Sequence, residues 1–283
     1  MHITGLPPPT PASTPSDAST DLTQARLKRQ SNIQLPGGKC YIEDLAVVSP
    51  DMLLVSNYVC VQLLDCLKGK VVSDVQVQGW PFKMCLTDKN TAAVNVGVKN
   101  IQMIKVKDKT LTKGGRELTV SGTIRGLTSS RNSLVVSYIS QPWLEVISMD
   151  GKVLHQFDKS GTSQHFKYPS FMCTTPGGSM FISDSSTNKI TKVDAQLNLL
   201  QTFTSPLLEK PGSITAVTED EILVCSQGNN SIVLLQPSTN TMSTLLGKDD
   251  GIEEPYSLTY CPDQKKIFIA SYHTDTIKVY HMS

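Results

Sequence analysis

A two-strand pattern of hydrophobic and polar positions recurs six times between residue 52 and the end of the chain. Its first part is a short run of strong strand formers that ends in a small or polar residue, as in MLLVS (52–56). A polar turn follows, and a second, alternating strand begins eight to ten residues after the run does, as in CVQLLD (60–65). Successive runs begin 39, 42, 46, 42 and 45 residues apart. Because alternation with period two is typical of strands, the pattern predicts paired β-strands in a repeating unit.

Each unit has room for further strands on both sides of this pair. A short apolar segment precedes the run and opens with proline in four units, at Pro81, Pro169, Pro211 and Pro255. Most units close with another short alternating segment, such as KVVSDVQV (70–77). Four short antiparallel strands in about 40–45 residues are the signature of a propeller blade. The sequence therefore predicts an all-β protein built from six blades.

The two ends of the repeating region complement each other. The sixth unit stops after its third strand, whereas a short strand at residues 32–35 stands before the first unit without a partner. Pairing the two strands removes an open sheet edge. We therefore predict that residues 31–283 form a six-bladed β-propeller closed by an N-terminal strand.

Residues 1–30 differ from the rest of the chain. The first twenty are rich in Pro, Ser and Thr and contain almost no large apolar residues, so they cannot bury enough surface to offset the entropy of ordering. We predict a disordered tail, with a possible short helix at residues 21–30 that is too short to be stable alone.

The composition bears on which partners the protein can bind and on where in the cell it is located. The 26 Lys and Arg residues nearly balance the 25 Asp and Glu residues, so net charge gives no general attraction to nucleic acid or to an anionic membrane. Seven cysteines lack CxxC spacing, which favours reduced, buried thiols. The first residues have neither the basic nor the apolar stretch of a secretory signal, and no apolar run is long enough for a membrane helix. We expect a cytoplasmic protein without a membrane contact.

One unit carries a recognisable repeat motif. The segment FISDSSTNKI (181–190) resembles the core of the NHL repeat, and GWPF (79–82) resembles the blade starts of the NHL propellers of tripartite-motif proteins. The resemblance covers residues 32–283 and implies an NHL-type propeller that serves as an adaptor. The aspartate of the motif is kept only at Asp184, and its basic residue only at Lys189. The chain has no Cys and His run with the zinc spacing of a RING finger or B-box, so ubiquitin transfer is not assigned to it.

Protein–protein interaction is the function that we expect first. Propellers present a rigid disc whose turns carry the binding residues, and Tyr and Trp are favoured anchors at interfaces. Tyr138 and Trp143 have packing between blades as an equally good interpretation. The candidates lie in or near the turns after the second strands: Asn57, Tyr58, Tyr138, Gln141, Trp143, Asp184, Tyr272 and His273.

Binding of single-stranded RNA is the alternative. Relatives of this type bind RNA through basic and stacking side chains on a propeller face. The second unit is locally basic, although a charged outer blade surface also serves solubility. The candidate residues are Lys99, Lys105, Lys107, Lys109, Lys113 and Arg116.

A calcium-dependent lactonase or esterase is the second alternative. Calcium takes six to eight oxygen ligands, normally including several carboxylates. The matching strand ends here offer Asn57, Asn95 and Asp184, which supply one carboxylate. None of the five histidines lies in a hydrolase motif, and no GxSxG is present. We therefore predict a non-enzymatic protein with no catalytic residues, no metal and no cofactor.

Overall fold

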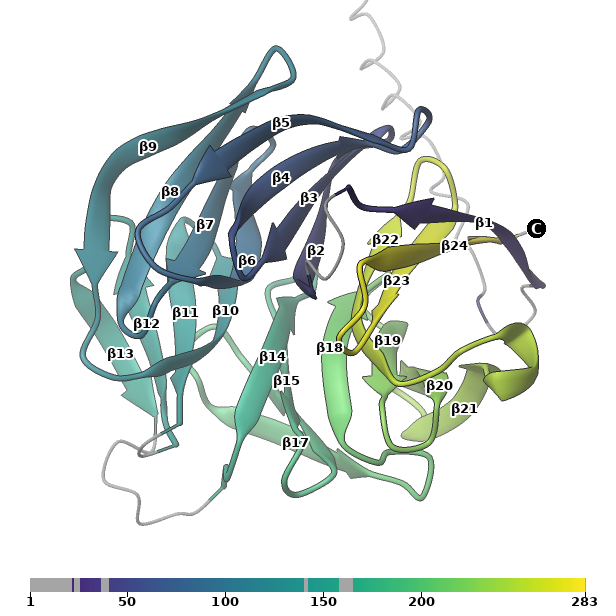
Figure 1. The fold of residues 1–283 in the computed structure, drawn as a ribbon. Coiled ribbons are helices and arrows are strands. Elements are labelled where there is room, and N and C mark those ends of the chain that lie inside the picture. Colours follow the sequence, from purple (N-terminus) through teal and green to yellow (C-terminus); the bar gives the residue numbers. More distant parts are fainter. Residues whose placement is uncertain (1–21, 23–25, 37–40, 140–141, 158–164, 283) are drawn as a thin grey trace, which may run out of the picture.

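The computed structural model describes residues 22, 26–36, 41–139, 142–157 and 165–282. Within this part of the chain, six four-stranded antiparallel sheets surround a common axis (Figure 1). Blade 1 consists of β2 (Ile42–Ser49), β3 (Met52–Asn57), β4 (Cys60–Asp65) and β5 (Lys70–Gln76). Blade 2 consists of β6 (Pro81–Asp88), β7 (Thr91–Val96), β8 (Asn100–Lys107) and β9 (Thr110–Thr119). Blade 3 consists of β10 (Ile124–Ser130), β11 (Ser133–Tyr138), β12 (Leu144–Ser148) and β13 (Val153–Phe157).

The second half of the chain repeats the arrangement. A single 3₁₀ turn, η1 (Lys248–Asp250), precedes blade 6. Blade 4 consists of β14 (Pro169–Thr174), β15 (Met180–Asp184), β16 (Lys189–Val193) and β17 (Leu199–Thr204). Blade 5 consists of β18 (Pro211–Ala216), β19 (Ile222–Ser226), β20 (Ser231–Gln236) and β21 (Thr241–Leu246). Blade 6 consists of β22 (Pro255–Cys261), β23 (Lys266–Ser271), β24 (Thr276–Met282) and β1 (Leu27–Gln34). The innermost strands β2, β6, β10, β14, β18 and β22 contact one another in a closed ring. The predicted six-bladed propeller is confirmed.

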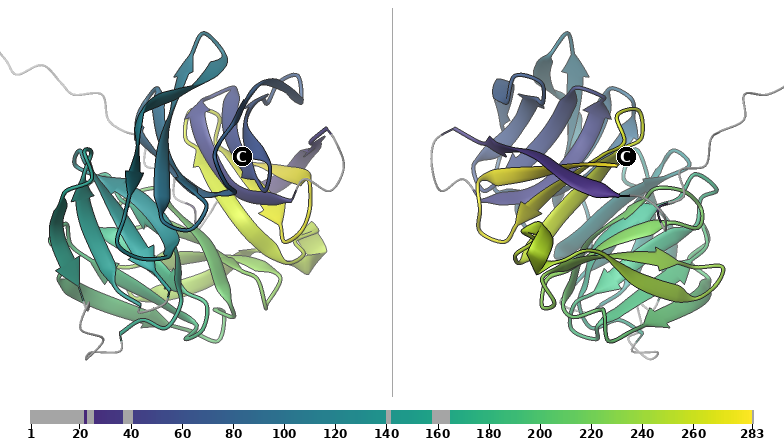
Figure 2. Two further views of the ribbon diagram at one scale, coloured as in Figure 1. Left: turned by 60° about the vertical axis from the view of Figure 1, so that its left-hand side comes forward. Right: turned by 90° about the vertical axis from the view of Figure 1, so that its right-hand side faces the viewer.

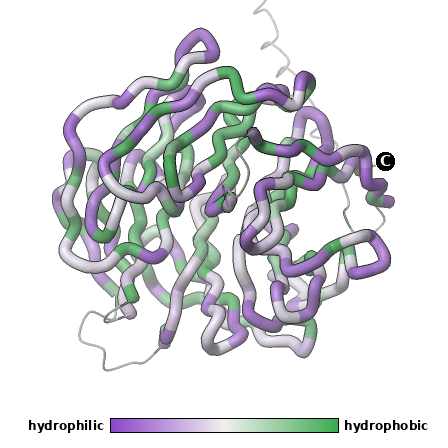
Figure 3. The backbone as a smooth tube through the Cα atoms, viewed as in Figure 1, coloured by the Kyte–Doolittle hydropathy of each residue, from purple (hydrophilic) through white to green (hydrophobic). Residues whose placement is uncertain are grey.

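The apolar runs of the second strands follow from their position between two neighbouring blades. In β3, Leu53 and Val55 pack toward blade 6, whereas Met52 and Leu54 pack toward blade 2. Both faces of such a strand are buried, so its sequence is continuously apolar rather than alternating. The outermost strand β5 has one partly exposed face, and its burial alternates along the strand. Figure 3 shows the same contrast between hydrophobic inner strands and hydrophilic turns.

The core is divided among the blade interfaces. Each of the six buried apolar clusters is shared between two consecutive blades, and none fills the axis. This division leaves a central passage that polar side chains line from both ends.

The N-terminal strand closes the ring. β1 runs antiparallel to β24, with partners from Leu27 and Met282 to Gln34 and Thr276, and both views in Figure 2 place the two strands side by side. Ile33 is buried in the cluster between blades 6 and 1. The prediction of a closing strand is therefore confirmed, and the strand is longer than residues 32–35.

The predicted helix at residues 21–30 is wrong for residues 27–30, which belong to β1. Ladder hydrogen bonds with β24 outweigh the weak helical preference of so short a segment. The expected disordered tail at residues 1–20 lies outside the described residues. No helix in the described part of the chain is long and apolar enough to cross a membrane.

Candidate functional site

The start of every innermost strand is irregular in the same way. The register of each first strand with its second strand shifts immediately after the first residue. Such β-bulges re-aim side chains and are common beside functional sites. The residues that follow the first position, one from each blade in order, are Glu43, Phe82, Arg125, Ser170, Gly212 and Tyr256.

These six positions surround one end of the axis and line a cavity of about 550 Å³, which we call the funnel. Residues from the turns after the second strands widen its mouth, among them Tyr58, Gln227 and Tyr272. Tyr168, Lys210 and Glu254 line it from the connections between blades. Every blade thus contributes a different side chain, which gives the funnel the asymmetry that selective binding requires.

Six aromatic side chains from blades 6, 1 and 2 contact one another in turn around the mouth of the funnel. Tyr256 and Tyr272 lie 5.3 Å apart between ring centroids, and Tyr272 stacks on His273 at 3.8 Å. Tyr41 stacks on His273 at 4.6 Å and meets Tyr58 edge-on. Tyr58 in turn meets Phe82 edge-on at 5.9 Å. We call this set the aromatic arc: Tyr41, Tyr58, Phe82, Tyr256, Tyr272 and His273.

A buried lysine lies beneath the arc and lines the cavity at the other end of the axis. Lys83 is 2% exposed, and its Nζ donates to the Glu43 carbonyl at 3.1 Å and to the Tyr256 hydroxyl at 3.3 Å. The same Nζ lies 3.5 Å from the centroid of the Phe171 ring, a cation–π contact. Burial lowers the pKa of Lys83 to about 8, although Asp44 and Glu43 act in the opposite direction. Lys83 is therefore a desolvated cation that contacts a carbonyl, a hydroxyl and two rings, and the charges of Asp44 and Glu43 offset part of the desolvation.

Asp44 ties three blades together beside Lys83. Its carboxylate accepts hydrogen bonds from the Leu45 and Met84 backbone N–H groups and from the Ser257 hydroxyl. Burial raises the pKa of Asp44, and the charge of Lys83 together with these donors opposes the rise. Tyr256 also donates to Glu43 at 3.2 Å, so hydrogen bonds link Lys83, Tyr256 and Glu43, and the charge of Asp44 acts on Lys83.

Arg125 is the exception in this network. Its guanidinium carbon lies 4.7 Å from the Tyr168 ring, and its Nε is buried without a hydrogen-bond partner. A buried donor without a partner costs free energy, so the guanidinium is less well satisfied than the polar groups of Lys83 and Asp44.

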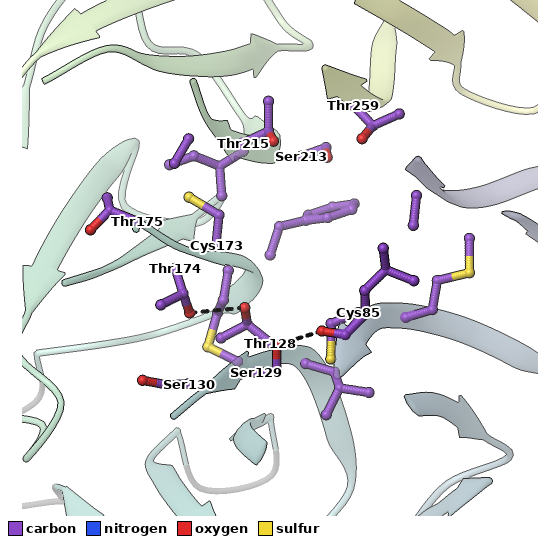
Figure 4. Close-up of a pocket in the computed structure, with 18 of the residues that line it drawn as sticks. Cys85, Thr128, Ser129, Ser130, Cys173, Thr174, Thr175, Ser213, Thr215 and Thr259 are labelled. Atoms are coloured by element: carbon purple, nitrogen blue, oxygen red, sulfur yellow. Dashed lines mark hydrogen bonds between the residues drawn. The ribbon is translucent and has the colours of Figure 1, made fainter. Parts of the chain in front are cut away.

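The opposite end of the axis opens into a second cavity of about 620 Å³, the hydroxyl channel (Figure 4). Thr128 and Thr174 bond each other at 3.2 Å, and Ser129 donates to the Leu86 carbonyl at 2.6 Å. Phe171 lines both cavities. Figure 4 shows the labelled hydroxyl and thiol side chains coming from several inner strands: Cys85, Thr128, Ser129, Ser130, Cys173, Thr174, Thr175, Ser213, Thr215 and Thr259. Burial raises the pKa of the Cys173 thiol to about 12, which makes it a poor nucleophile. The funnel, with its charges and aromatic rings, is the stronger candidate site.

Three of the predicted protein-binding residues belong to the aromatic arc. Tyr58 is 36% exposed and Tyr272 is 39% exposed, and His273 is exposed beside them. Gln141 lies outside the described residues.

The other four predicted residues are buried, and their side chains pack between blades or cap turns: Asn57, Tyr138, Trp143 and Asp184. Asn57 accepts from the backbone N–H groups of Val59 and Cys60. Asp184 accepts from four backbone N–H groups, including those of Lys167 and Tyr168. These four side chains are therefore corrected from partner contacts to structural groups.

The packing interpretation holds for the buried aromatic pair. The Tyr138 ring lies 4.5 Å from that of Trp143, and its hydroxyl donates to Glu145. Both rings fill the cluster between blades 2 and 3.

The basic residues proposed for RNA are exposed and lie on a different surface. They are on or beside the outer strands β8 and β9 of blade 2, and none of them lines the funnel. Lys109 forms an ion pair with Asp65 at 3.5 Å. RNA binding stays a prediction for this separate surface.

The candidate calcium ligands do not converge. Asn95 donates to the carbonyls of Gly97 and Asn100, and Asn57 and Asp184 bond their own turns. Among the described residues, no group of three or more His, Cys, Asp or Glu side chains is placed to hold a metal ion.

Sequence reasoning missed most of the funnel, including Glu43, Arg125 and Tyr256, and it missed the buried Lys83 that contacts Tyr256. A signal was present, because four of the six bulge residues directly follow the proline that opens a blade. Aligning the units on that proline places Phe82, Ser170, Gly212 and Tyr256 in one column.

The fold and the funnel define the chain as a six-bladed β-propeller with a polar and aromatic cavity at one end of its axis. No protein-family model matches the sequence, and a search of curated proteins finds no match. Among solved structures, virginiamycin B lyase from Staphylococcus aureus is similar with a TM-score of 0.66 and 13% identity, over 90% of this chain and 99% of that one. A streptogramin B lyase is similar with a TM-score of 0.64 and 13% identity, over 93% of this chain and 99% of that one. At this identity the likeness shows the propeller fold.

Proposed function

We propose that this protein is a non-enzymatic interaction module that binds a peptide segment of a partner protein in the funnel. The proposal depends on one observation: a cavity with opposite charges on its wall, Glu43 and Glu254 against Arg125 and Lys210, lies beside an arc of partly exposed rings. A single-stranded nucleic acid favours a continuous positive groove, whereas mixed charge with aromatic anchors suits a protein surface.

Exposed apolar side chains extend this surface over blades 1 and 2. Trp80 is 63% exposed, Val98 is 59% exposed and Val59 is 54% exposed. They lie in the same set of turns as Tyr58, at the funnel end of their blades. Exposed Trp and Tyr residues around a pocket are typical of the centre of an interface. This surface supports an adaptor role, as does the NHL-like motif at residues 181–190.

We also propose a cytoplasmic location. The six cysteines of the described residues are free thiols, and disulfides are rare in the cytoplasm.

The binding proposal is tested by selecting ligands from a peptide library displayed on phage. We expect Tyr272→Ala to weaken the selected peptides at least about tenfold, because a buried aromatic anchor at a hot spot contributes about 2 kcal/mol or more. Isothermal titration calorimetry on the folded variants measures the loss.

Leu67→Ala is the matched control. Leu67 is 69% exposed in the turn between β4 and β5, at the opposite end of the axis. Equal affinities of the wild type and Tyr272→Ala for every selected peptide, or equal losses in both variants, contradict binding in the funnel.

An axial enzyme is the second candidate function. It is supported by the names of the two similar structures, both lyases, and by an amine with a pKa of about 8 that is hydrogen bonded to Tyr256. Incubation with virginiamycin B, with and without calcium, followed by mass spectrometry, tests for its conversion. Conversion that requires Lys83 or Tyr256 favours this candidate, and an unchanged antibiotic removes this substrate from consideration.

A further inference from the structure

Arg125 stands on the funnel wall without an acidic partner. Among the described residues it forms no ion pair, and its only described interaction beyond charge effects is the contact with the Tyr168 ring. The Nε atom is fully buried and bonds to nothing. Glu43, by contrast, is occupied by the Tyr256 hydroxyl. Among the described residues that line the funnel, Arg125 is therefore a cation that no carboxylate pairs, and the complementary group of a ligand is an acceptor.

The charges around Arg125 point the same way. The Arg125 charge lowers the pKa of Lys83, so two cations repel each other across the base of the funnel. Arg125 also acts on Tyr58 and Tyr256, where its charge opposes the rise in their pKa values. A negative group bound where the guanidinium lines the funnel relieves this repulsion.

On this basis we propose that Arg125 is the anchor for an acidic side chain, Asp or Glu, of the peptide that the funnel binds. This inference rests on the proposed function and names the chemistry of its ligand. The guanidinium offers a planar pair of donors that matches a carboxylate in a bidentate pair.

The surroundings select a carboxylate within a chain. Arg125 and Lys210 on the wall are balanced by Glu43 and Glu254, so a single negative charge is accommodated better than the double charge of a phosphate. Rings lie on both sides of Arg125, with Tyr168 next to it and the aromatic arc across the funnel. The peptide residues before and after the acidic residue can therefore both contact aromatic rings. A peptide bound through its C-terminal carboxylate has residues on one side of that group only.

The experiment uses pools of octapeptides with blocked ends, a fixed central residue and randomised flanks. The central residue is Glu, Gln, Lys or phosphoserine, and a further Gln pool has a free C-terminal carboxylate. Fluorescence polarisation with the full chain is expected to show the Glu pool at least about tenfold tighter than the Gln pool, as a charge-assisted bidentate pair allows. Arg125→Met is expected to remove this difference, and Arg125→Lys to retain part of it. Arg116→Met, the same change at an exposed residue of β9 away from the funnel, is the control and should leave the difference intact.

A second measurement separates binding from folding. Within the described part of the chain the Arg125 side chain forms no ion pair and its Nε bonds to nothing, so Arg125→Met should leave the melting temperature unchanged or raise it, as substitutions at functional residues often do. A fall of more than about 5 °C indicates a structural arginine and overturns the proposal.

The outcomes are distinguishable from failure of the proposed function. If all pools bind with equal affinity and Tyr272→Ala weakens them, peptide binding stands and the carboxylate anchor is wrong. Tightest binding of the phosphoserine, Lys or free-carboxylate pool overturns the internal carboxylate in favour of that group. If no pool binds to the wild type, both proposals fail.

Discussion

A variant that begins at Tyr41, and so lacks β1, is expected to lose the cooperative unfolding of the intact propeller. The deletion leaves β24 as an open edge and removes seven paired positions. It also uncovers the apolar cluster between blades 6 and 1, in which Ile33 and Leu35 are buried. Burial of each such side chain contributes about 1.5–3 kcal/mol, so the total loss of about 5 kcal/mol approaches the whole stability of many domains. Urea titration followed by circular dichroism measures it.

Two further samples make this result decisive. A variant that lacks only residues 1–21 keeps β1 and should unfold like the full chain. Addition of a synthetic peptide of residues 26–36 should restore a cooperative transition to the truncated protein, because it re-forms the ladder with β24. A truncated protein with the midpoint of the full chain shows that β1 contributes little.

Raising the pH from 7 to 9.5 is expected to stabilise the wild type relative to Lys83→Met by about 2 kcal/mol. Burial lowers the pKa of Lys83 to about 8 from 10.5, so the folded state releases this proton at a lower pH than the unfolded chain. Above pH 8 the unfolded chain binds more protons at this residue than the folded state does. Stability contributed by Lys83 therefore rises with pH through this window.

The difference between the two proteins is the quantity to measure, by urea unfolding at several pH values. Buried thiols and tyrosines act in the opposite direction, because burial raises the pKa of groups such as Tyr256 and Cys85. Those effects are common to both proteins and largely cancel. Lys210→Met, at an exposed residue of the funnel rim, is the control. A difference in the free energy of unfolding between wild type and Lys83→Met that stays constant from pH 7 to 9.5 contradicts a lowered pKa of the buried lysine.

The repeating blades were predictable because their pattern is local. Strands such as β3 and β15 are buried on both faces, and their apolar runs recur at a nearly constant distance from the alternating strand that follows. The unpaired strand at residues 32–35 then predicted which segment closes the ring of blades. Residues 27–30 were assigned wrongly because their structure depends on β24, about 250 residues away in sequence.

The funnel was harder to predict because it lies where period-two alternation breaks. At each bulge one residue is added on one strand, so the side chain after the opening proline changes face. Alternation alone therefore does not direct Arg125 or Tyr256 toward the axis. The turn residues Tyr58 and Tyr272 were found because turns need no such register, whereas Asn57 and Asp184 were misjudged because capping a turn requires the same polar residue types as binding.

The pairing of β1 with β24 also determines how the molecule is tethered. Leu27 lies opposite Met282, so the chain enters β1 and leaves β24 at the same edge of blade 6, near the mark for the C-terminus in Figure 1. β24 begins at Thr276, beside the turn that holds Tyr272 and His273, and runs away from the funnel. Leu27 and Met282 thus lie on the side of blade 6 that is opposite the funnel. A protein immobilised through a site beside Leu27 or beside Met282 presents its funnel away from the support, and both attachments should give the same affinity for a ligand.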